Sequence, residues 1–189
     1  EIPTDFEMPP GGLNIRWPDE PLAQEARLHE HKRYAAQAFA RANGLDRIVI
    51  DSPQPRLGII TTGKAYLDVR QALDTLGISE AQAAGIGLRV YKVGMSWPLD
   101  KTTLRGFAKG LEEVLVVEEK RPLLEDQVKA QLYSQPEATR PRVIGKFDET
   151  GARVLCSHGT LSPGEIARLI AARLHRFYTS EQIQGRIAY

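Results

Sequence analysis

Short apolar runs alternate with longer amphipathic segments through the middle of the chain. Three runs, at 57–61, 88–93 and 114–117, are rich in β-branched side chains. Such side chains pack well on a pleated surface, and strands that are apolar throughout are typical of a parallel sheet covered on both faces. The pattern therefore predicts parallel strands joined by helical crossovers.

The segments around these runs complete the predicted architecture. Further strands are expected at 47–50, 142–145 and 152–156. Helices are expected at 21–43, 65–77 and 99–110, from Pro122 to 133, and from Ser162 to 177. The first helix should break near His29, and the third should have Asp100 or Thr102 as its N-cap. Gly77 suits a left-handed helix end, and Ser162 with Glu165 has the form of a capping box. We expect an α/β fold of three layers, doubly wound around a mainly parallel sheet of about five strands. An N-terminal arm and helix precede it.

The same pattern divides the chain into three parts. Residues 1–21 hold several prolines and the pair Gly11-Gly12 without any period, which predicts an extended arm or linker that adds nothing to the core. Residues 22–178 form the α/β domain with its leading helix. Residues 179–189 are expected to be a linker toward a following domain. Because the sequence begins at Glu1 and not at methionine, we expect it to be a piece of a longer protein.

Composition narrows the class of protein. Of the 189 residues, 42% are hydrophobic and 26% are charged, and the formal charge of +1 gives no sign of a nucleic-acid partner. No apolar run approaches the roughly 20 residues that span a bilayer. We expect a soluble, cytoplasmic protein. The single cysteine, Cys156, excludes an intrachain disulfide and a cysteine-cluster metal site built by one copy of the chain.

The segment from Gly58 to Ala65 approaches the phosphate-binding P-loop, G-x-x-x-x-G-K-[ST]. The match fails because Ala65 has no hydroxyl group for magnesium and because Gly58 lies inside a predicted strand. What remains is a tight turn at Gly63, with Lys64 presented at a helix N-terminus. Such a turn could hold an anion or the carboxylate of a partner.

Other polar groups also lie at predicted strand ends, which form the working edge of an open parallel sheet. Glu118, Glu119 and Lys120 follow the run at 114–117, and interface pairing is favoured over acid–base chemistry for them. Trp97 follows the run at 88–93 and suits either an edge contact or the core. These residues, with Gly63 and Lys64, are the candidate interface or anion contacts.

The histidines and the cysteine give weaker signals. His29 and His31 are two residues apart, so on a helix they point in different directions and a shared metal is disfavoured. Cys156 and His158 lack an orienting group and an oxyanion site nearby, so an ordinary loop is favoured over a nucleophile–base pair. We expect no catalytic residue, no cofactor ligand and no metal ligand in this chain.

The amino-acid sequence around the three strand ends resembles that of the C-terminal domain of transketolase-like thiamine diphosphate enzymes. The relevant segments are 59–64, 93–100 and 114–119. Within that group, Gly63-Lys64-Ala65-Tyr66, Met95 to Leu99 and Glu118 to Pro122 are most similar to the 2-oxoacid:ferredoxin oxidoreductases that act on indolepyruvate. The resemblance covers about residues 20–178.

The resemblance implies an enzyme that oxidatively decarboxylates aryl pyruvates such as indolepyruvate to acyl-coenzyme A and passes electrons to ferredoxin. It implies thiamine diphosphate, magnesium and iron–sulfur clusters in the full protein, none of them in this segment. The implied role here is that of a noncatalytic central domain between thiamine-binding domains of the same chain, serving packing and subunit assembly, with a homo-oligomer as the full-length state.

Two other classes of function stay open. One is a self-contained small-molecule or nucleotide-binding α/β protein that uses the turn at Gly63 and Lys64 together with Glu118. The other is a regulatory interaction module, suggested by the arm at residues 1–21.

Overall fold

The computed structural model describes residues 1–14 and 17–187. Its centre is a five-stranded sheet with strand order β1-β3-β2-β4-β5. The strands are β1 (Arg47–Ile50), β2 (Leu57–Thr62), β3 (Leu88–Val93), β4 (Glu113–Val117) and β5 (Arg142–Ile144). Strands β2 to β5 are parallel where they pair, and β1 adds to β3 in the antiparallel sense. The predicted mainly parallel sheet of about five strands is confirmed.

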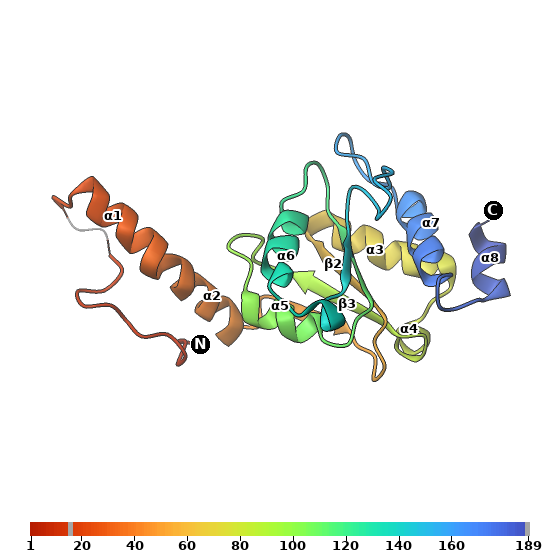
Figure 1. Cartoon of the computed structure of the whole chain (residues 1–189), viewed down its shortest axis with the longest axis horizontal. Coiled ribbons are helices and arrows are strands. Elements are labelled where there is room, and N and C mark those ends of the chain that lie inside the picture. The colour runs from red at the N-terminus through yellow and green to blue at the C-terminus, as the bar shows by residue number, and fades with distance from the viewer. Residues whose placement is uncertain (15–16, 188–189) are drawn as a thin grey trace.

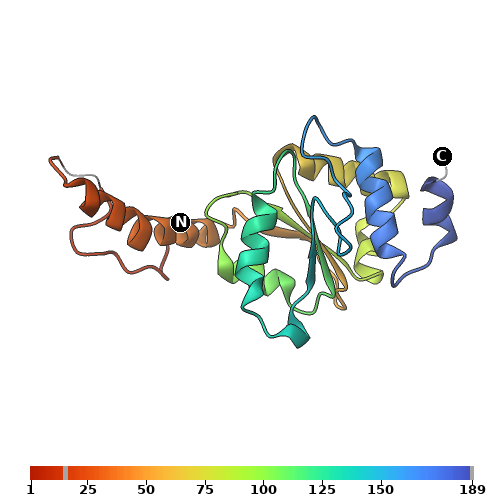
Figure 2. The same ribbon diagram turned by 45° about the horizontal axis from the view of Figure 1, so that its top comes forward.

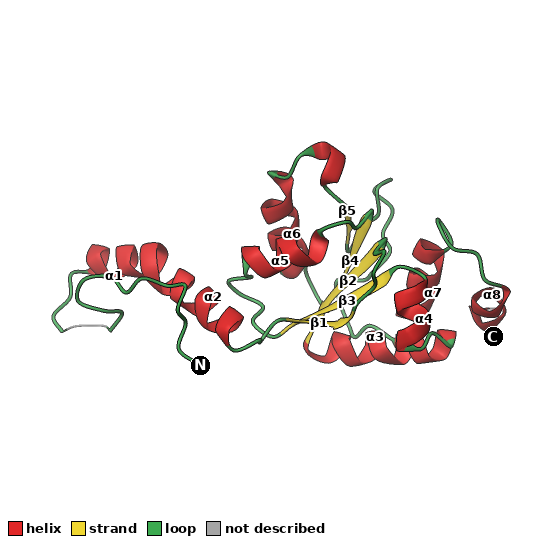
Figure 3. Ribbon diagram, turned by 90° about the horizontal axis from the view of Figure 1, so that it is seen from below, coloured by secondary structure: helices red, strands yellow, loops and turns green. Residues whose placement is uncertain are grey.

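Helices cover both faces of this sheet, as the uniformly apolar strands predicted. They are α1 (Pro21–Arg27), the π-helical segment η1 (Leu28–Lys32), α2 (Arg33–Ala42), α3 (Gly63–Leu76), α4 (Glu80–Gly85), α5 (Lys101–Ala108), α6 (Leu124–Tyr133), the 3-10 turn η2 (Glu137–Thr139), α7 (Pro163–Leu174) and α8 (Glu181–Ile187). Figure 3 shows α5 and α6 on one face and α3, α4 and α7 on the other. The three-layer, doubly wound architecture is therefore confirmed.

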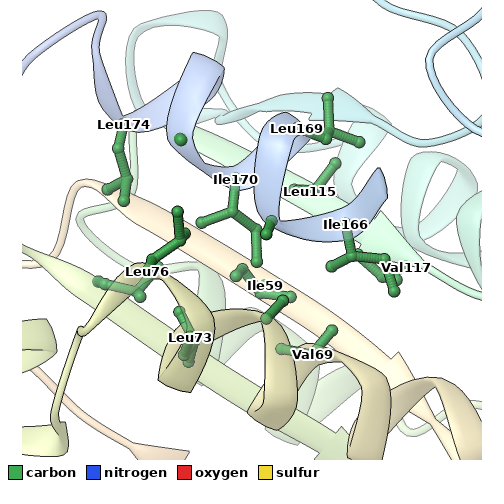
Figure 4. Close-up of a cluster of buried hydrophobic side chains, with 14 of the residues drawn as sticks. Ile59, Val69, Leu73, Leu76, Leu115, Val117, Ile166, Leu169, Ile170 and Leu174 are labelled. Carbon is green, nitrogen blue, oxygen red and sulfur yellow. The ribbon is translucent and has the colours of Figure 1, made fainter. Parts of the chain in front are cut away.

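The larger hydrophobic cluster lies between the sheet and the pair α3 and α7. Figure 4 shows Ile59 of β2 and Leu115 of β4 facing side chains from both helices. Residue Ile170 of α7 and Val69 of α3 are fully buried there. Because alternate residues of a strand face opposite sides, the next residue of each strand enters the second cluster.

The second cluster lies between the sheet and the pair α5 and α6. It takes Ile60 and Val116 from the sheet and Phe107 from α5. The rings of Tyr91 and Phe107 stack with their centroids 5.0 Å apart, which adds an aromatic contact to the apolar packing. The expected burial of Ile60, Val90, Val116 and Val117 is confirmed, since each is at most 1% exposed.

Local signals set the helix ends as the sequence indicates. Gly77 ends α3 in the left-handed conformation with φ of 70°. The side chain of Asp100 caps α5 by accepting a hydrogen bond from the Thr103 amide at 2.8 Å. Ser162 and Glu165 form both halves of the capping box at the start of α7. Each of these contacts satisfies backbone groups that a helix end leaves unpaired.

One predicted strand is wrong, and one predicted helix begins later than expected. Residues 152–156 do not form a strand, and only an isolated bridge joins Arg153 to Phe147. The carboxylate of Asp148 closes a tight turn by accepting from the Thr150 and Ala152 amides, so the segment is held as a loop. Helix α6 is present as predicted, but it begins at Leu124 and leaves Pro122 outside, because the Glu118 side chain caps it there.

The end of the chain packs on the domain. Residues 179–189 were expected to be a linker, yet α8 forms within them and Ile183 joins the larger cluster. Gln182 and Arg186 of α8 reach carbonyl groups at the end of α3. Residues 181–187 therefore pack on the domain, and a linker toward a following domain stays a prediction.

The leading helix projects away from the sheet (Figures 1 and 2). It has the predicted break near His29, where η1 replaces α-helical geometry. Residues of the arm run back beside it: Asp5 pairs with Arg41 at 2.6 Å, and the amino group of Glu1 meets Asn43. None of the described residues of the arm is buried, so it adds nothing to the core.

Replacing Gly58 by alanine is expected to destabilise the domain by about 1–3 kcal/mol through overpacking. A Cβ at this point of β2 would lie 2.4 Å from Leu111 Cδ1 and 2.7 Å from Phe107 Cζ. Urea denaturation measures the change. The matched control is Gly106→Ala in α5, where nothing lies within 4 Å of the added Cβ. That variant should gain roughly 0.5–1 kcal/mol from helix propensity. Equal effects of the two changes would contradict the close approach at Gly58.

Candidate functional site at the carboxyl ends of the strands

The sheet has a topological switch point between β2 and β4. The chain leaves β2 through α3 toward β3, and it leaves β4 through α6 toward β5 on the other side and over the other face. Open parallel sheets bind their ligands in the crevice outside the carboxyl ends at such a point. A hollow of about 320 Å³ lies there, lined among others by Lys64, Ser96, Glu118, Glu119 and Lys120. The structure thus brings together candidates that are far apart in the sequence.

Lys64 is already engaged by two carboxylates. Gly63 makes the tight turn with φ of 55°, and the Lys64 ammonium then lies 2.6 Å from Asp68 Oδ2 and 3.6 Å from Glu119 Oε1. The hydrogen bond to Asp68, with the charge of both acids, raises the pKa of Lys64. Because two anions face one cation, this turn is poorly suited to a further anion.

Glu118 caps a helix from a neighbouring strand. Its side chain is buried and accepts hydrogen bonds from the backbone amides of Leu123, Leu124 and Glu125 at 3.0, 2.9 and 2.9 Å. These amides belong to the first turn of α6, whose own N-cap residue provides no side-chain hydrogen bond. A carboxylate at a helix N-terminus is stabilised by the unpaired amides and the helix dipole. Glu118 is therefore a structural group in this arrangement.

The side chains of Glu119 and Lys120 make contacts away from α6. Glu119 faces the α3 side, and its Oε1 has no hydrogen-bond partner among the described residues, since 3.6 Å to Lys64 Nζ is an ion pair only. Lys120 adopts the left-handed region with φ of 59° and donates from Nζ to the Gly159 carbonyl at 2.6 Å. The two adjacent acids, which follow the end of β4, thus serve different contacts.

Lys146 is a buried basic residue that the sequence pattern did not indicate. It is 1% exposed, and its Nζ donates to the carbonyls of Glu118 and Cys156. Burial lowers the pKa of Lys146. Its own amide donates to Glu125 Oε2 at 2.8 Å, so the lysine joins the end of β4 to α6 and to the loop before α7. Only the fold places it beside Glu118.

Trp97 stands out from the surface beside these polar groups. It is 54% exposed, so it does not fill the core, and Leu123 nearby in the lining of the hollow is 45% exposed. The loop that carries Trp97 is held in place: Asp46 accepts from the amides of Gly94 and Met95, and Gln127 donates to the Ser96 carbonyl. An exposed tryptophan on a loop held in this way is typical of an interface anchor.

The remaining sequence candidates are not brought to this edge. The thiol of Cys156 donates to the His158 carbonyl, so it meets the backbone and not the imidazole. His29 and His31 lie on the projecting helix, in η1. Within residues 1–14 and 17–187, no three or more His, Cys, Asp or Glu side chains gather as a metal site. Among the same residues no helix is long and apolar enough to cross a membrane.

Comparisons with known proteins agree with this architecture. The indolepyruvate oxidoreductase domain model matches residues 46–189. The IorA subunit of indolepyruvate oxidoreductase from Thermococcus kodakarensis is 36% identical over 80 residues, which are 42% of this chain and 11% of that protein. The IorA subunit from Methanothermobacter marburgensis is 35% identical over 111 residues, 59% of this chain and 16% of that protein. The chain thus matches only a small part of these relatives.

A solved structure shares the fold. The 2-oxoglutarate:ferredoxin oxidoreductase from Magnetococcus marinus, with 2-oxoglutarate, coenzyme A and succinyl-CoA bound, superposes with a TM-score of 0.51 at 16% identity. The match covers 89% of this chain and 26% of that one. The family match over most of the sequence confirms the resemblance to indolepyruvate oxidoreductases that the sequence around the strand ends indicated. The chain belongs to the indolepyruvate oxidoreductase domain family.

Proposed function

We propose that this chain is a noncatalytic packing module of a larger indolepyruvate:ferredoxin oxidoreductase. One observation carries the proposal: the acids at the strand ends are engaged within the domain beside an exposed Trp97 on a loop held by hydrogen bonds. Glu118 is used by α6, and Glu119 and Lys64 face each other. Such an edge is better suited to receive a neighbouring domain than to move protons on a substrate.

The whole enzyme would oxidatively decarboxylate aryl pyruvates such as indolepyruvate to acyl-coenzyme A and deliver electrons to ferredoxin. The names of the relatives as indolepyruvate oxidoreductase subunits support this proposal. Thiamine diphosphate, magnesium and iron–sulfur clusters would be held elsewhere in that enzyme. The residues of this chain do not fit an iron–sulfur cluster, because a cluster needs several thiolates and only Cys156 is present.

The proposed domain boundaries follow the same scheme. Residues 1–21 would be an extended arm or linker, 22–178 the transketolase C-terminal-like domain with its leading helix, and 179–189 a linker toward a following domain. Flanking thiamine-binding domains of the same chain, and a second copy in a homo-oligomer, are the proposed partners. The match to only part of each IorA relative supports the presence of such neighbours.

The edge that would receive a neighbour is continuous with the projecting helix. Arg41 of α2 pairs with buried Asp100 at 2.5 Å, and Gln37 donates to the Leu99 carbonyl at 2.9 Å. These contacts anchor the C-terminal half of the helix to the loop that carries Trp97. A partner seated on the strand ends would therefore also meet this helix.

Replacing Trp97 by serine tests the packing role in two versions of the protein. In the 189-residue chain the melting temperature should stay nearly unchanged, because the indole is half exposed. In the full-length protein the unfolding free energy should fall by about 2 kcal/mol or more, the effect of removing a buried interface tryptophan. The matched control is Tyr133→Ser, which alters a 77% exposed aromatic residue at the opposite end of the sheet. Equal stability of the full-length protein and its Trp97 variant would contradict the proposal.

Ligand titration distinguishes this role from that of a self-contained binding protein, which the hollow of about 320 Å³ favours. Calorimetry of the 189-residue chain with thiamine diphosphate and magnesium, and with ATP, should show no saturable heat. Submicromolar binding that is abolished by Lys64→Ala would overturn the packing role and establish the alternative.

A further inference from the structure

A second hollow of the domain lies at the other end of the sheet. Its volume is about 640 Å³, about twice that of the hollow at the carboxyl ends. It is bounded by the C-terminal end of α5, the C-terminal end of α6 and the turn η2. This size is within the range of pockets that hold small organic molecules.

Three basic side chains surround this hollow: Arg105, Lys109 and Arg140. No carboxylate among the described residues lies within ion-pair distance of any of them. The single acid in the lining, Glu112, forms an ion pair with Arg56, with Oε1 2.6 Å from the arginine Nε. The lining therefore carries an uncompensated positive charge, in contrast to the paired charges around Lys64.

The guanidinium groups are held in place without being saturated. Arg105 donates from Nη2 to the Ser134 hydroxyl at 3.0 Å, and its buried Nε has no hydrogen-bond partner among the described residues. Arg140 lies over the ring of Tyr133 and donates from Nη1 to its carbonyl at 2.9 Å. Both side chains keep N–H groups for a bound anion, and guanidinium groups recognise carboxylate and phosphate in this way.

The floor of the hollow is apolar. Ala108, Leu111, Leu132 and Pro141 line it, and all four are buried in the domain. A simple inorganic anion would meet the rim only and leave this floor wet. An apolar body carrying one anionic group would use both features.

We propose that this hollow binds an organic anion with an apolar body, held by Arg105, Lys109 and Arg140 at its rim. The site is separate from the packing edge, because it lies at the amino ends of the strands. It would give the domain a small-molecule ligand in addition to its packing role.

Naphthalene-2-carboxylate is the probe, titrated into the 189-residue chain and followed by calorimetry and by amide NMR shifts. Saturable binding with shifts centred on Ala108, Gly110 and Ala138 is expected. Naphthalene-2-carboxamide, which keeps the apolar body, should bind at least about tenfold more weakly, because a charged hydrogen bond is lost. Inorganic phosphate, which lacks that body, should also bind more weakly.

Arg105→Gln should weaken binding of the carboxylate at least about tenfold. Lys109→Gln should weaken binding of the carboxylate as well, and because Lys109 is exposed this substitution should leave the fold intact. The matched control is Arg70→Gln on α3, across the sheet, which should bind like the parent chain. The absence of saturable binding up to about 5 mM would overturn the proposal, since a millimolar dissociation constant already marks weak binding. Equal affinities for the carboxylate and the carboxamide would overturn it too. Binding that is insensitive to both rim substitutions would overturn it as well.

Discussion

Replacing Arg173 by methionine is expected to lower the unfolding free energy by about 3–5 kcal/mol. Arg173 of α7 and Glu113 of β4 form a bidentate pair, with Nε to Oε1 at 2.6 Å and Nη2 to Oε2 at 2.5 Å. The two residues are 7% and 5% exposed. Without the guanidinium, the carboxylate would stay in the interior with little solvent and a weak partner.

The neighbouring charges cannot replace Arg173. Arg142 approaches Glu113 at 3.4 Å, but its side chain is 46% exposed. Glu149 binds both Arg173 and Arg176, and its hydrogen bond to Arg176 contributes most to lowering its pKa to about 2. Removal of Arg173 would therefore break the centre of a network that joins α7 to the amino ends of β4 and β5.

Urea denaturation near neutral pH measures this loss. Arg142→Met serves as the control and should cost no more than about 1 kcal/mol, as an exposed pair does. The double variant Glu113→Leu with Arg173→Met should recover much of the loss, because no unpaired charge is left buried. A loss below about 1 kcal/mol for Arg173→Met alone would show that this ion pair does not hold α7 to the sheet.

The second large effect is expected at Glu118. Glu118→Gln keeps the volume but removes the charge that faces three backbone amides, and it places an NH₂ group against N–H donors. Hydrogen bonds to charged groups each contribute roughly 1.5–3 kcal/mol, so a loss of about 2–4 kcal/mol is expected after partial replacement by the amide oxygen. Urea denaturation followed by circular dichroism measures the change.

Glu119→Gln is the matched control, one residue further along the chain. Its side chain is 27% exposed and forms only the 3.6 Å ion pair with Lys64, so the expected change is below about 1 kcal/mol. A reversed order of the two effects would show that Glu118 does not cap α6. It would also remove the main reason for regarding this strand end as structural.

The limits of sequence reasoning are visible at these same residues. The polar strand end at Glu118 was recognised, but the role of the side chain depends on amides five to seven residues later, across a turn. Lys146 reaches the Glu118 carbonyl from 28 residues away. Contacts at such separations leave no periodic signal in the chain. The strand expected at 152–156 was wrong for a similar reason, since a side-chain turn at Asp148 competes with sheet pairing.

The amino-acid sequence alone determined the parallel α/β class, the strands from β1 to β5, most helix boundaries and the family. These follow from apolar periodicity, capping residues and short motifs, which act over neighbouring residues. Only the tertiary structure decided which charges meet: that Lys64 faces Glu119, that Glu118 caps α6, and that Trp97 is exposed. The physical reason is that ion pairing and exposure depend on distances across the sheet, which the crossover connections set and local sequence does not encode.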